Sequence, residues 1–180
     1  MDVEKFTERS RGFVQSAQGM ALRSGHQRFT PEHLLKVLLE DEEGLASNLI
    51  RATGGRPEQA LQAVDLALDK LPKVEGSGAG QVYLAPEMAR VFDAAEKVAE
   101  KAGDKFVTAE RLLLALVMAT GTPAAEALKN AGVTAQGLNA AINEIRKGRT
   151  AYSATAENAY DAMKKYARDL TQAARDGKLD

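Results

Sequence analysis

An internal repeat of 78 residues constrains the fold of this chain more than any other feature of its sequence. Residues 25–39 return as residues 103–117, with one Gly, one Thr, one Glu and three Leu at matching positions. In each copy the Gly can take a positive φ and end one helix, and the Thr can cap the next. Because the Leu residues also form one apolar stripe, the repeat predicts a hinge between two helices that occurs twice. The matching positions are Gly25 and Gly103, Thr30 and Thr108, Glu32 and Glu110, Leu34 and Leu112, Leu35 and Leu113, and Leu38 and Leu116.

The composition favours packed helices over a sheet. Hydrophobic residues make up 44% of the 180 residues, but aromatic residues make up only 5% and Trp is absent, so the runs typical of strands are missing. The net charge of −1 provides no attraction to nucleic acid or to an anionic membrane surface, and no apolar stretch approaches membrane-spanning length. The chain has no Cys, and its first residues carry acids where a signal peptide would be apolar. We therefore expect a cytoplasmic, mainly helical protein that binds neither nucleic acid nor membrane.

The apolar periodicity predicts four helices in each copy of the repeat. The expected fold is all-α, a pseudo-symmetric double repeat of a four-helix motif that forms an eight-helix bundle. The predicted domain covers residues 1–147, with repeats at about 6–72 and 84–147 joined by a connector that is flexible by its Gly and Ser content. A polar linker is predicted at residues 148–155, and an amphipathic helix at residues 156–180.

Two glycines interrupt the first predicted helix. This helix begins after the N-cap Thr7 and ends at Gly25. Gly12 and Gly19 lie inside it, and each costs roughly 1 kcal/mol relative to Ala. Either another segment packs closely against these positions or the helix is weak.

Motifs that carry enzymatic chemistry are largely absent from the sequence. His26 and His33 lack the spacing and the partner ligands of a metal site, so exposed or capping roles are the better interpretation. The Gly-rich run at 76–80 has neither the Lys-Ser/Thr of a P-loop nor a strand before it. No nucleophile elbow or buried carboxylate pair is recognisable. We therefore predict that the chain is not an enzyme, with no catalytic residue and no metal site.

Five residues admit both a structural and a binding role. Thr7 can be a helix N-cap, Glu110 a first-turn acid and Asp104 a loop residue after the hinge Gly, but loops and helix ends also often carry function. Phe92 and Val98 lie on the apolar face of the fifth predicted helix, where burial in the core is more common than contact with a ligand. The residues alone leave both roles open.

Three segments of the chain resemble one family. The doubled pattern Gly-Asp/His-x-x-Phe/Val-Thr-x-Glu-x-Leu-Leu resembles the Clp N-terminal domain, which is a double repeat of a four-helix motif. The connector from Leu71 to Gly76, followed by the segment from Gln81 to Leu84, is similar to that of the ClpB branch, the ATP-dependent protein disaggregases. Residues 163–180 are similar to the segment that leads into the first AAA+ ATPase module of these chaperones. The resemblance spans the whole chain and has its motifs in the order of the family.

The resemblance implies that the chain is the N-terminal part of a larger hexameric machine. In this family the N domain is a tethered module that captures unfolded or aggregated polypeptide in an apolar groove and helps to pass it to the hexamer pore. The ATP and Mg²⁺ sites would lie beyond Asp180, so no cofactor is expected in this chain. The implied partners are the unfolded polypeptide, the AAA+ modules of the full-length chain and, through that chain, the Hsp70 chaperone system.

The resemblance also implies a client-binding site with a polar rim and an apolar groove. The family often has an apolar residue where this chain has Arg111, so the chain departs from the family at that part of the groove. Because most of the implied residues belong to the second copy of the repeat, we expect both copies to supply the scaffold and the second to supply the function. The residues that carry over are Thr7, Asp104 and Glu110 at the rim, and Phe92 and Val98 in the groove.

Two alternatives remain open on the sequence. One is the N domain of a protease-partner Clp ATPase, whose main ligand is a folded adaptor protein. The other is a stand-alone double-repeat protein that self-associates through its last helix. A downstream Gly-x-x-x-x-Gly-Lys-Thr motif in the gene would separate both ATPase classes from the stand-alone protein.

Overall fold

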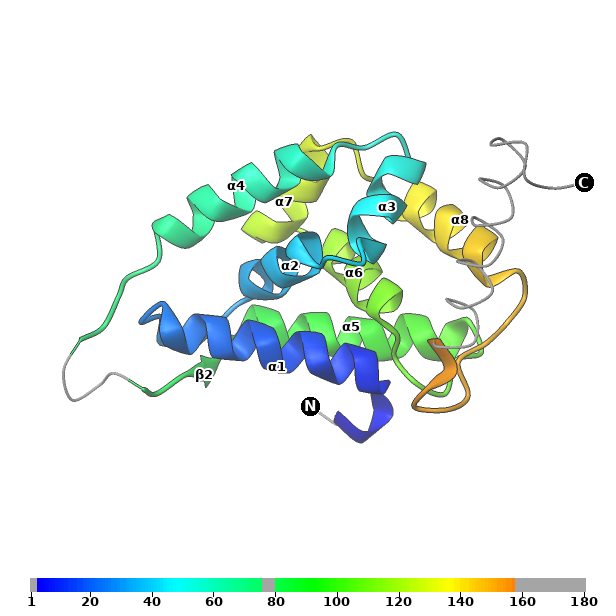
Figure 1. Cartoon of the computed structure of the whole chain (residues 1–180), viewed down its shortest axis with the longest axis horizontal. Helices are drawn as coiled ribbons and strands as arrows, with labels where there is room; N and C mark the ends of the chain where they lie inside the picture. The colour runs from blue at the N-terminus through cyan, green and yellow to red at the C-terminus, as the bar shows by residue number, and fades with distance from the viewer. Residues whose placement is uncertain (1–2, 76–79, 158–180) are drawn as a thin grey trace, which may run out of the picture.

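The computed structural model describes residues 3–75 and 80–157, and within these ranges the chain forms eight α-helices in two sets of four (Figure 1). The predicted all-α double repeat is therefore confirmed. Most of the helix predicted at residues 156–180 and part of the Gly-rich connector lie outside the described residues. The helices are α1 (Glu8–Arg23), α2 (Pro31–Glu40), α3 (Leu45–Ala52) and α4 (Pro57–Asp69) in the first set, and α5 (Pro86–Lys101), α6 (Ala109–Met118), α7 (Pro123–Asn130) and α8 (Ala135–Arg146) in the second.

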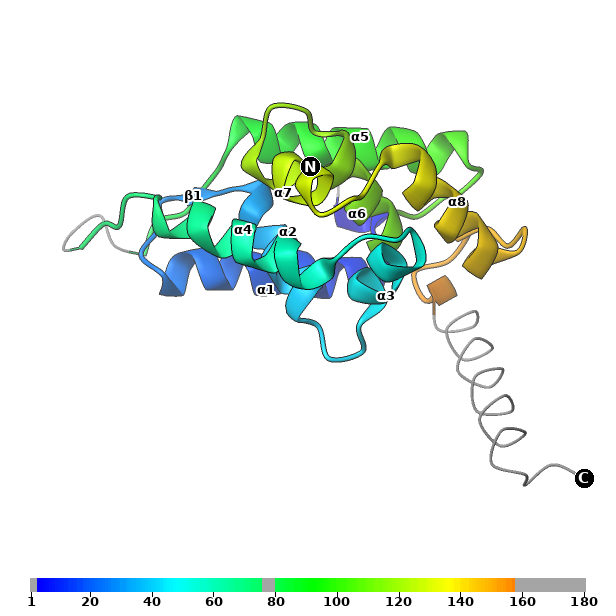
Figure 2. The same ribbon diagram turned by 90° about the horizontal axis from the view of Figure 1, so that it is seen from above.

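The helices pack in three layers, as Figure 1 and Figure 2 show. Helices α2 and α6 lie in the middle, between α1 and α5 on one side and α4 and α7 on the other. Helix α4 packs against α7 and α3 against α8, so the last two helices of each repeat take partners from the other repeat. Within the described residues no single helix is long and apolar enough to cross a membrane, and α6 and α7 meet both criteria only together, across a bend of 95°.

The helix boundaries follow local signals in the sequence. Thr7 and Thr108 are N-caps whose hydroxyl oxygens accept hydrogen bonds from first-turn backbone N–H groups at 3.2 and 3.4 Å. Pro stands at the start of α2, α4, α5 and α7, where its missing N–H needs no partner. The hinge residues Gly25 and Gly103 have φ angles of 74° and 85°, in the left-handed region that favours glycine. The repeated segment therefore forms the same hinge in both copies.

The Leu stripe of the repeat lies at the centre of the core. Leu34 and Leu112, which are equivalent in the two copies, are both 0% exposed. The rings of Phe6 and Phe29 pack against Phe92, with centroid distances of 5.6 and 6.2 Å. Buried side chains of both repeats belong to one contiguous cluster, so the two repeats share a core.

Two parallel backbone pairings join the two repeats, and the two pairings occur at equivalent positions of the repeat. Strand β1 (Arg28–Phe29), in the first hinge, pairs with β2 (Tyr83–Leu84), which precedes α5. In the equivalent place Phe6, which follows the 3₁₀-helix η1 (Val3–Lys5) and precedes α1, pairs with Val107 in the second hinge. Positions 6 and 84, like positions 29 and 107, are 78 residues apart. In each repeat, the segment before the first helix therefore pairs with the hinge of the other repeat.

The segment after α8, residues 148–157, lies against the domain. We call this segment the strap. Ala151 is 0% exposed, and its carbonyl oxygen accepts hydrogen bonds from the backbone N–H groups of Lys105 at 2.8 Å and Phe106 at 3.1 Å. The polar composition that predicted a linker at residues 148–155 gave no sign of these contacts.

Gly12, on the exposed side of α1, has no packing partner. A Cβ added at Gly12 would meet no atom within 4 Å, whereas a Cβ at Gly19 would lie 3.1 Å from Nη1 of Arg23. Gly12→Ala is expected to raise the free energy of unfolding by about 0.5–1 kcal/mol, because Ala favours the helix and lowers the entropy of the unfolded chain. Chemical denaturation measures this difference. A variant less stable than wild type would contradict the prediction, and Gly19→Ala, which must displace Arg23, is expected to gain less.

Candidate functional site

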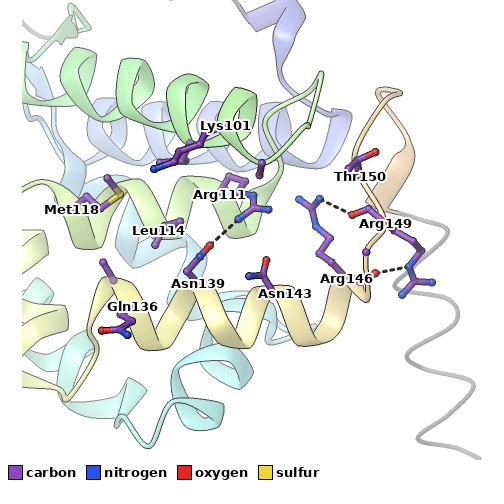
Figure 3. A pocket seen from close by; sticks show the side chains of 14 residues that line it. Lys101, Arg111, Leu114, Met118, Gln136, Asn139, Asn143, Arg146, Arg149 and Thr150 are labelled. Carbon is purple, nitrogen blue, oxygen red and sulfur yellow. Dashed lines mark hydrogen bonds between the residues drawn. The ribbon is translucent and has the colours of Figure 1, made fainter.

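A pocket of about 730 Å³ opens between α5, α6, α8 and the strap (Figure 3). Its volume lies within the range of roughly 300–1,000 Å³ that is usual for ligand sites. Each of the three helices forms one side, and the beginning of the strap closes one end. The lining residues are Val98, Lys101, Ala102, Arg111, Leu114, Met118, Ala135, Gln136, Asn139, Asn143, Arg146, Gly148, Arg149 and Thr150.

The pocket combines apolar surface with hydrogen-bond donors. Val98, Leu114 and Met118 supply the apolar surface, and Met118 is 45% exposed. Nearby, Nη1 of Arg111 donates to Oδ1 of Asn139 at 3.2 Å, as Figure 3 shows. Of the lining residues that the structure describes, none carries a carboxylate. The exposed side chains of Lys101, Gln136 and Asn143 carry further donors, so the pocket offers an extended peptide both apolar surface and donors for its backbone carbonyl groups.

A buried ion cluster lies behind the pocket. Arg146, the last residue of α8, donates to Asp104 through Nη1 at 2.8 Å and through Nη2 at 3.0 Å. Nη2 of Arg146 also donates to Oε1 of Glu110 at 2.9 Å and to the hydroxyl of Thr108 at 2.8 Å. Nε of Arg111 donates to Oδ2 of Asp104 at 3.2 Å, and the side chains of both acids are 0% exposed. The cluster therefore joins α8 to the second hinge and holds two of the arginines that line the pocket.

Asp104 is ionised in this cluster. Burial by itself would raise the pKa of Asp104, but hydrogen bonds from Arg146, from the Ala151 amide and from Arg111 lower the pKa below its ordinary value. The Ala151 N–H, which belongs to the strap, donates to Oδ1 of Asp104 at 2.8 Å. A buried charge is stable only when it is paired and hydrogen-bonded. Asp104 thus connects the arginines of the pocket with the strap.

The family model of the Clp repeat (R) N-terminal domain matches residues 5–131 of the chain. The chain belongs to the Clp N-terminal domain family. The matched residues include both hinges and the helices α1 to α7. The match therefore rests on the double repeat that organises the fold.

Curated relatives of this Clp N domain include proteins named chaperone protein ClpB. The ClpB of Rhodopseudomonas palustris is 69% identical over 180 residues, which are 100% of this chain and 20% of that protein. The ClpB of Mesorhizobium japonicum is 60% identical over the same 180 residues, which are 100% of this chain and 21% of that protein. The chain thus spans about a fifth of the length of these relatives. It corresponds to the Clp N domain, a binding domain, and not to their ATPase modules.

Solved structures of other Clp N domains share this fold. The N-terminal domain of Hsp104 from Candida albicans superposes with a TM-score of 0.72 at 18% identity, over 84% of this chain and 98% of that chain. The N-terminal domain of the ClpV1 ATPase from E. coli superposes with a TM-score of 0.63 at 22% identity, over 77% of this chain and 83% of that chain. At these identities the likeness concerns the fold alone.

The five residues expected to form the client site of the Clp N domain lie in different places. Val98 lines the pocket. Asp104 and Glu110 lie together in the ion cluster, behind the pocket wall. Thr7 is the fully buried N-cap of α1, and Phe92 is 2% exposed and packs with other Phe rings in the core. Of the five, only Val98 is among the pocket-lining residues that the structure describes.

Sequence reasoning missed Arg146, which holds both acids of the cluster. Its signal was present: Leu138, Ile142 and Arg146 are four residues apart and share one face of α8, and all three are buried. An Arg that continues an apolar helical stripe is a candidate for a buried ion pair. Nothing in the local sequence tells which carboxylates it meets, because Asp104 lies 42 residues away.

The two histidines form a separate buried pair in the first hinge of the Clp N domain. His26 is 6% and His33 0% exposed, so the exposed role is wrong for both. The Thr30 N–H donates to Nδ1 of His33 at 3.0 Å, so the capping role is correct for His33, and Nε2 of His33 lies 2.8 Å from Nδ1 of His26. Burial, and then the charge of His26, lower the pKa of His33 to about 4, so this ring is neutral at pH 7. Among the described residues, no group of three or more metal-binding side chains comes together.

Proposed function

We propose that this chain is the client-binding domain of a ClpB-type disaggregase, and that it captures unfolded or aggregated polypeptide in the pocket between α5, α6 and α8. The observation that carries the proposal is the pairing of apolar surface with hydrogen-bond donors in that pocket. An unfolded chain offers both apolar side chains and unpaired backbone carbonyl groups. A folded protein has buried most of its large apolar side chains and has paired most of its backbone carbonyl groups. The pocket therefore favours unfolded clients.

The relatives support a disaggregase over a protease-partner ATPase, because the chain is 69% and 60% identical to proteins named ClpB. The remaining parts of the proposal concern the whole protein. They are a hexamer of AAA+ modules that uses ATP and Mg²⁺, transfer of the client to its pore, cooperation with the Hsp70 system, and a cytoplasmic location. A folded adaptor as the main ligand is the competing proposal, and it predicts that unfolded protein does not compete for the pocket.

Capture by this pocket is expected to be weak and tolerant of sequence. Apolar burial contributes about 25 cal/mol per Å² and has no directional requirement. Among the described residues that line the pocket, Met118 is the one large hydrophobic residue that is exposed, at 45%. A client that samples the pocket with any large apolar side chain would bind, and would leave again quickly.

Met118→Ser is expected to weaken binding of an unfolded protein about fivefold. Burying a whole Met side chain is worth about 1.5–3 kcal/mol, and Met118 has about half of its surface left to bury, so about 1 kcal/mol is lost. The measurement is an NMR titration of the labelled chain with a reduced, carboxymethylated protein that cannot fold. The shifts of the pocket residues on α5, α6 and α8 should report the binding.

Leu66→Ser provides the matched control for this titration. Leu66, on α4, is 62% exposed and lies outside the pocket, so its loss removes a comparable exposed apolar side chain. The control is expected to bind as wild type does. Equal weakening by both substitutions would mean that general surface stickiness, and not the pocket, binds the client.

A further inference from the structure

The strap is bonded to the domain at three points along its length. Besides the contacts of Ala151, the carbonyl oxygen of Ala154 accepts a hydrogen bond from the backbone N–H of Glu8 at 2.9 Å. Further on, Oε2 of Glu157 accepts a hydrogen bond from the backbone N–H of Ala109 at 3.0 Å. Glu157 is 1% exposed, and this end of the strap is therefore seated in the domain.

Two of these N–H donors belong to the first residue of a helix, and at both positions the two repeats differ in sequence. Glu8 and Ala109 are the first residues of α1 and α6, and their N–H groups have no acceptor within their own helices. At the equivalent positions the other repeat has Pro86 and Pro31, which carry no N–H. The strap thus supplies acceptors at the two places where one copy of the repeat needs them and the other does not.

The three polar residues that the family resemblance places at a client rim all meet the strap. Asp104 accepts the hydrogen bond of the Ala151 N–H at 2.8 Å. The Thr7 hydroxyl, which donates to Oγ of Ser10 at 3.0 Å, is near enough to the Glu157 carboxyl group to lower its pKa, and the carboxylate of Glu110 is near enough to raise it. None of the three is among the described residues that line the pocket.

We infer that Thr7, Asp104 and Glu110 form the docking site for the chain's own strap, and that they affect client binding through the strap instead of by touching the client. The second half of this inference rests on the proposed function of the pocket. Residues 148–150 of the strap line the pocket, so the strap is one of its walls. Release of the strap removes that wall, and the client loses contact area.

The Glu157 carboxyl group makes docking sensitive to pH. Burial, and then repulsion from Glu110, raise the pKa of Glu157 from 4.5 to about 7. The nearby Thr7 hydroxyl, the hydrogen bond from the Ala109 N–H and the charge of Arg9 act in the opposite direction and lower it. The docked strap therefore holds this proton more tightly than the free strap does. Docking is strongest below pH 4.5 and weakens as the pH rises through 7.

The test uses the substitution that the other repeat already contains. Glu8→Pro removes the N–H that binds Ala154, copies Pro86, and suits both the first helical position and the extended backbone of the preceding Thr7. We expect the Ala151 amide to exchange its hydrogen at least about tenfold faster, because strap release exposes it. Affinity for the reduced, carboxymethylated protein should fall at least about threefold, since one wall of the pocket is lost. Glu8→Ala keeps the N–H and should match wild type in both measurements.

Each outcome decides one part of the inference, and a wild-type far-UV spectrum with a cooperative unfolding transition verifies the fold of each variant. Unchanged exchange at Ala151 in Glu8→Pro would overturn the docking site. Faster exchange with unchanged affinity would overturn the role of the strap in client binding. Thr7→Ala added to Glu8→Pro should have no further effect on affinity, and a further loss would mean that Thr7 touches the client. If wild type does not bind the unfolded protein at all, the proposed function fails, while the exchange comparison still tests the docking.

Glu157→Gln separates the effect of the Glu157 proton from the effect of the hydrogen bond that Glu157 accepts from the Ala109 N–H. The Gln side chain keeps an oxygen that can accept from the Ala109 N–H, but it has no proton to lose. Strap protection, corrected for the intrinsic pH dependence of exchange, should fall between about pH 4.5 and about pH 7 in wild type and stay constant in Glu157→Gln. The same fall in both proteins would overturn the part assigned to Glu157.

Discussion

Asp104→Ala is expected to lower the free energy of unfolding by about 3–5 kcal/mol, the usual cost of removing one partner from a buried ion pair. The carboxylate accepts two hydrogen bonds from Arg146, one from Arg111 and one from the Ala151 amide. Its removal leaves two buried cations without the acceptor that they share. Urea denaturation with linear extrapolation measures the loss.

Asp93→Ala is the matched control for this large effect. Asp93 pairs with Lys97 at 3.4 Å on the surface of α5, where the two side chains are 65% and 77% exposed. Such a pair contributes less than about 1 kcal/mol. If Asp104→Ala cost no more than Asp93→Ala, the cluster would not hold the domain together.

Leu112→Ala is expected to destabilise the domain by about 2–5 kcal/mol, because it leaves a cavity in a packed core. Leu112 is 0% exposed, and its equivalent in the first repeat, Leu34, is 0% exposed as well. Leu34→Ala should therefore cost a similar amount. Since the two repeats share one core, the whole domain should unfold in a single transition, and each substitution should lower the midpoint of that transition.

Leu66→Ala controls for the intrinsic effect of replacing Leu in a helix. Leu66 is 62% exposed on α4, and a substitution there should change the free energy of unfolding by no more than about 0.5 kcal/mol. A cost below about 1 kcal/mol for Leu112→Ala would place this stripe outside the core. Separate transitions for the two repeats would contradict the shared core.

Pairs of equivalent residues show where prediction from the sequence reaches its limit. Glu32 and Glu110 occupy the same position of the repeat, in the first turn of α2 and α6, and both are buried. Glu32 accepts a hydrogen bond from the Ala124 N–H at 3.1 Å, whereas Glu110 binds Arg146. The local sequence makes both residues first-turn acids. Their partners come from other helices, 92 and 36 residues away in the chain.

The candidate site also divides into features that the local sequence predicts and contacts that distant segments supply. Val98 was expected in a client groove because its helix and the family resemblance were both recognisable. It lines the pocket, and its contact with a client stays a prediction. The burial of Asp104 could not be predicted, because it depends on Arg146 and on the Ala151 N–H arriving from distant segments. The polar strap resembles an ordinary linker, because its apolar contacts are few and its bonds are made by the backbone.

The sequence by itself determined the repeat, the eight helices with their Thr, Pro and Gly boundaries, and the Leu stripe. These features depend on interactions within a few residues, which every copy of the same local sequence repeats. Only the tertiary structure decided that Thr7, Asp104 and Glu110 are buried, and that the pocket is lined by α5, α6 and α8. The physical reason is that a polar side chain takes its partner from whatever segment packs against it, and that segment can lie anywhere in the chain.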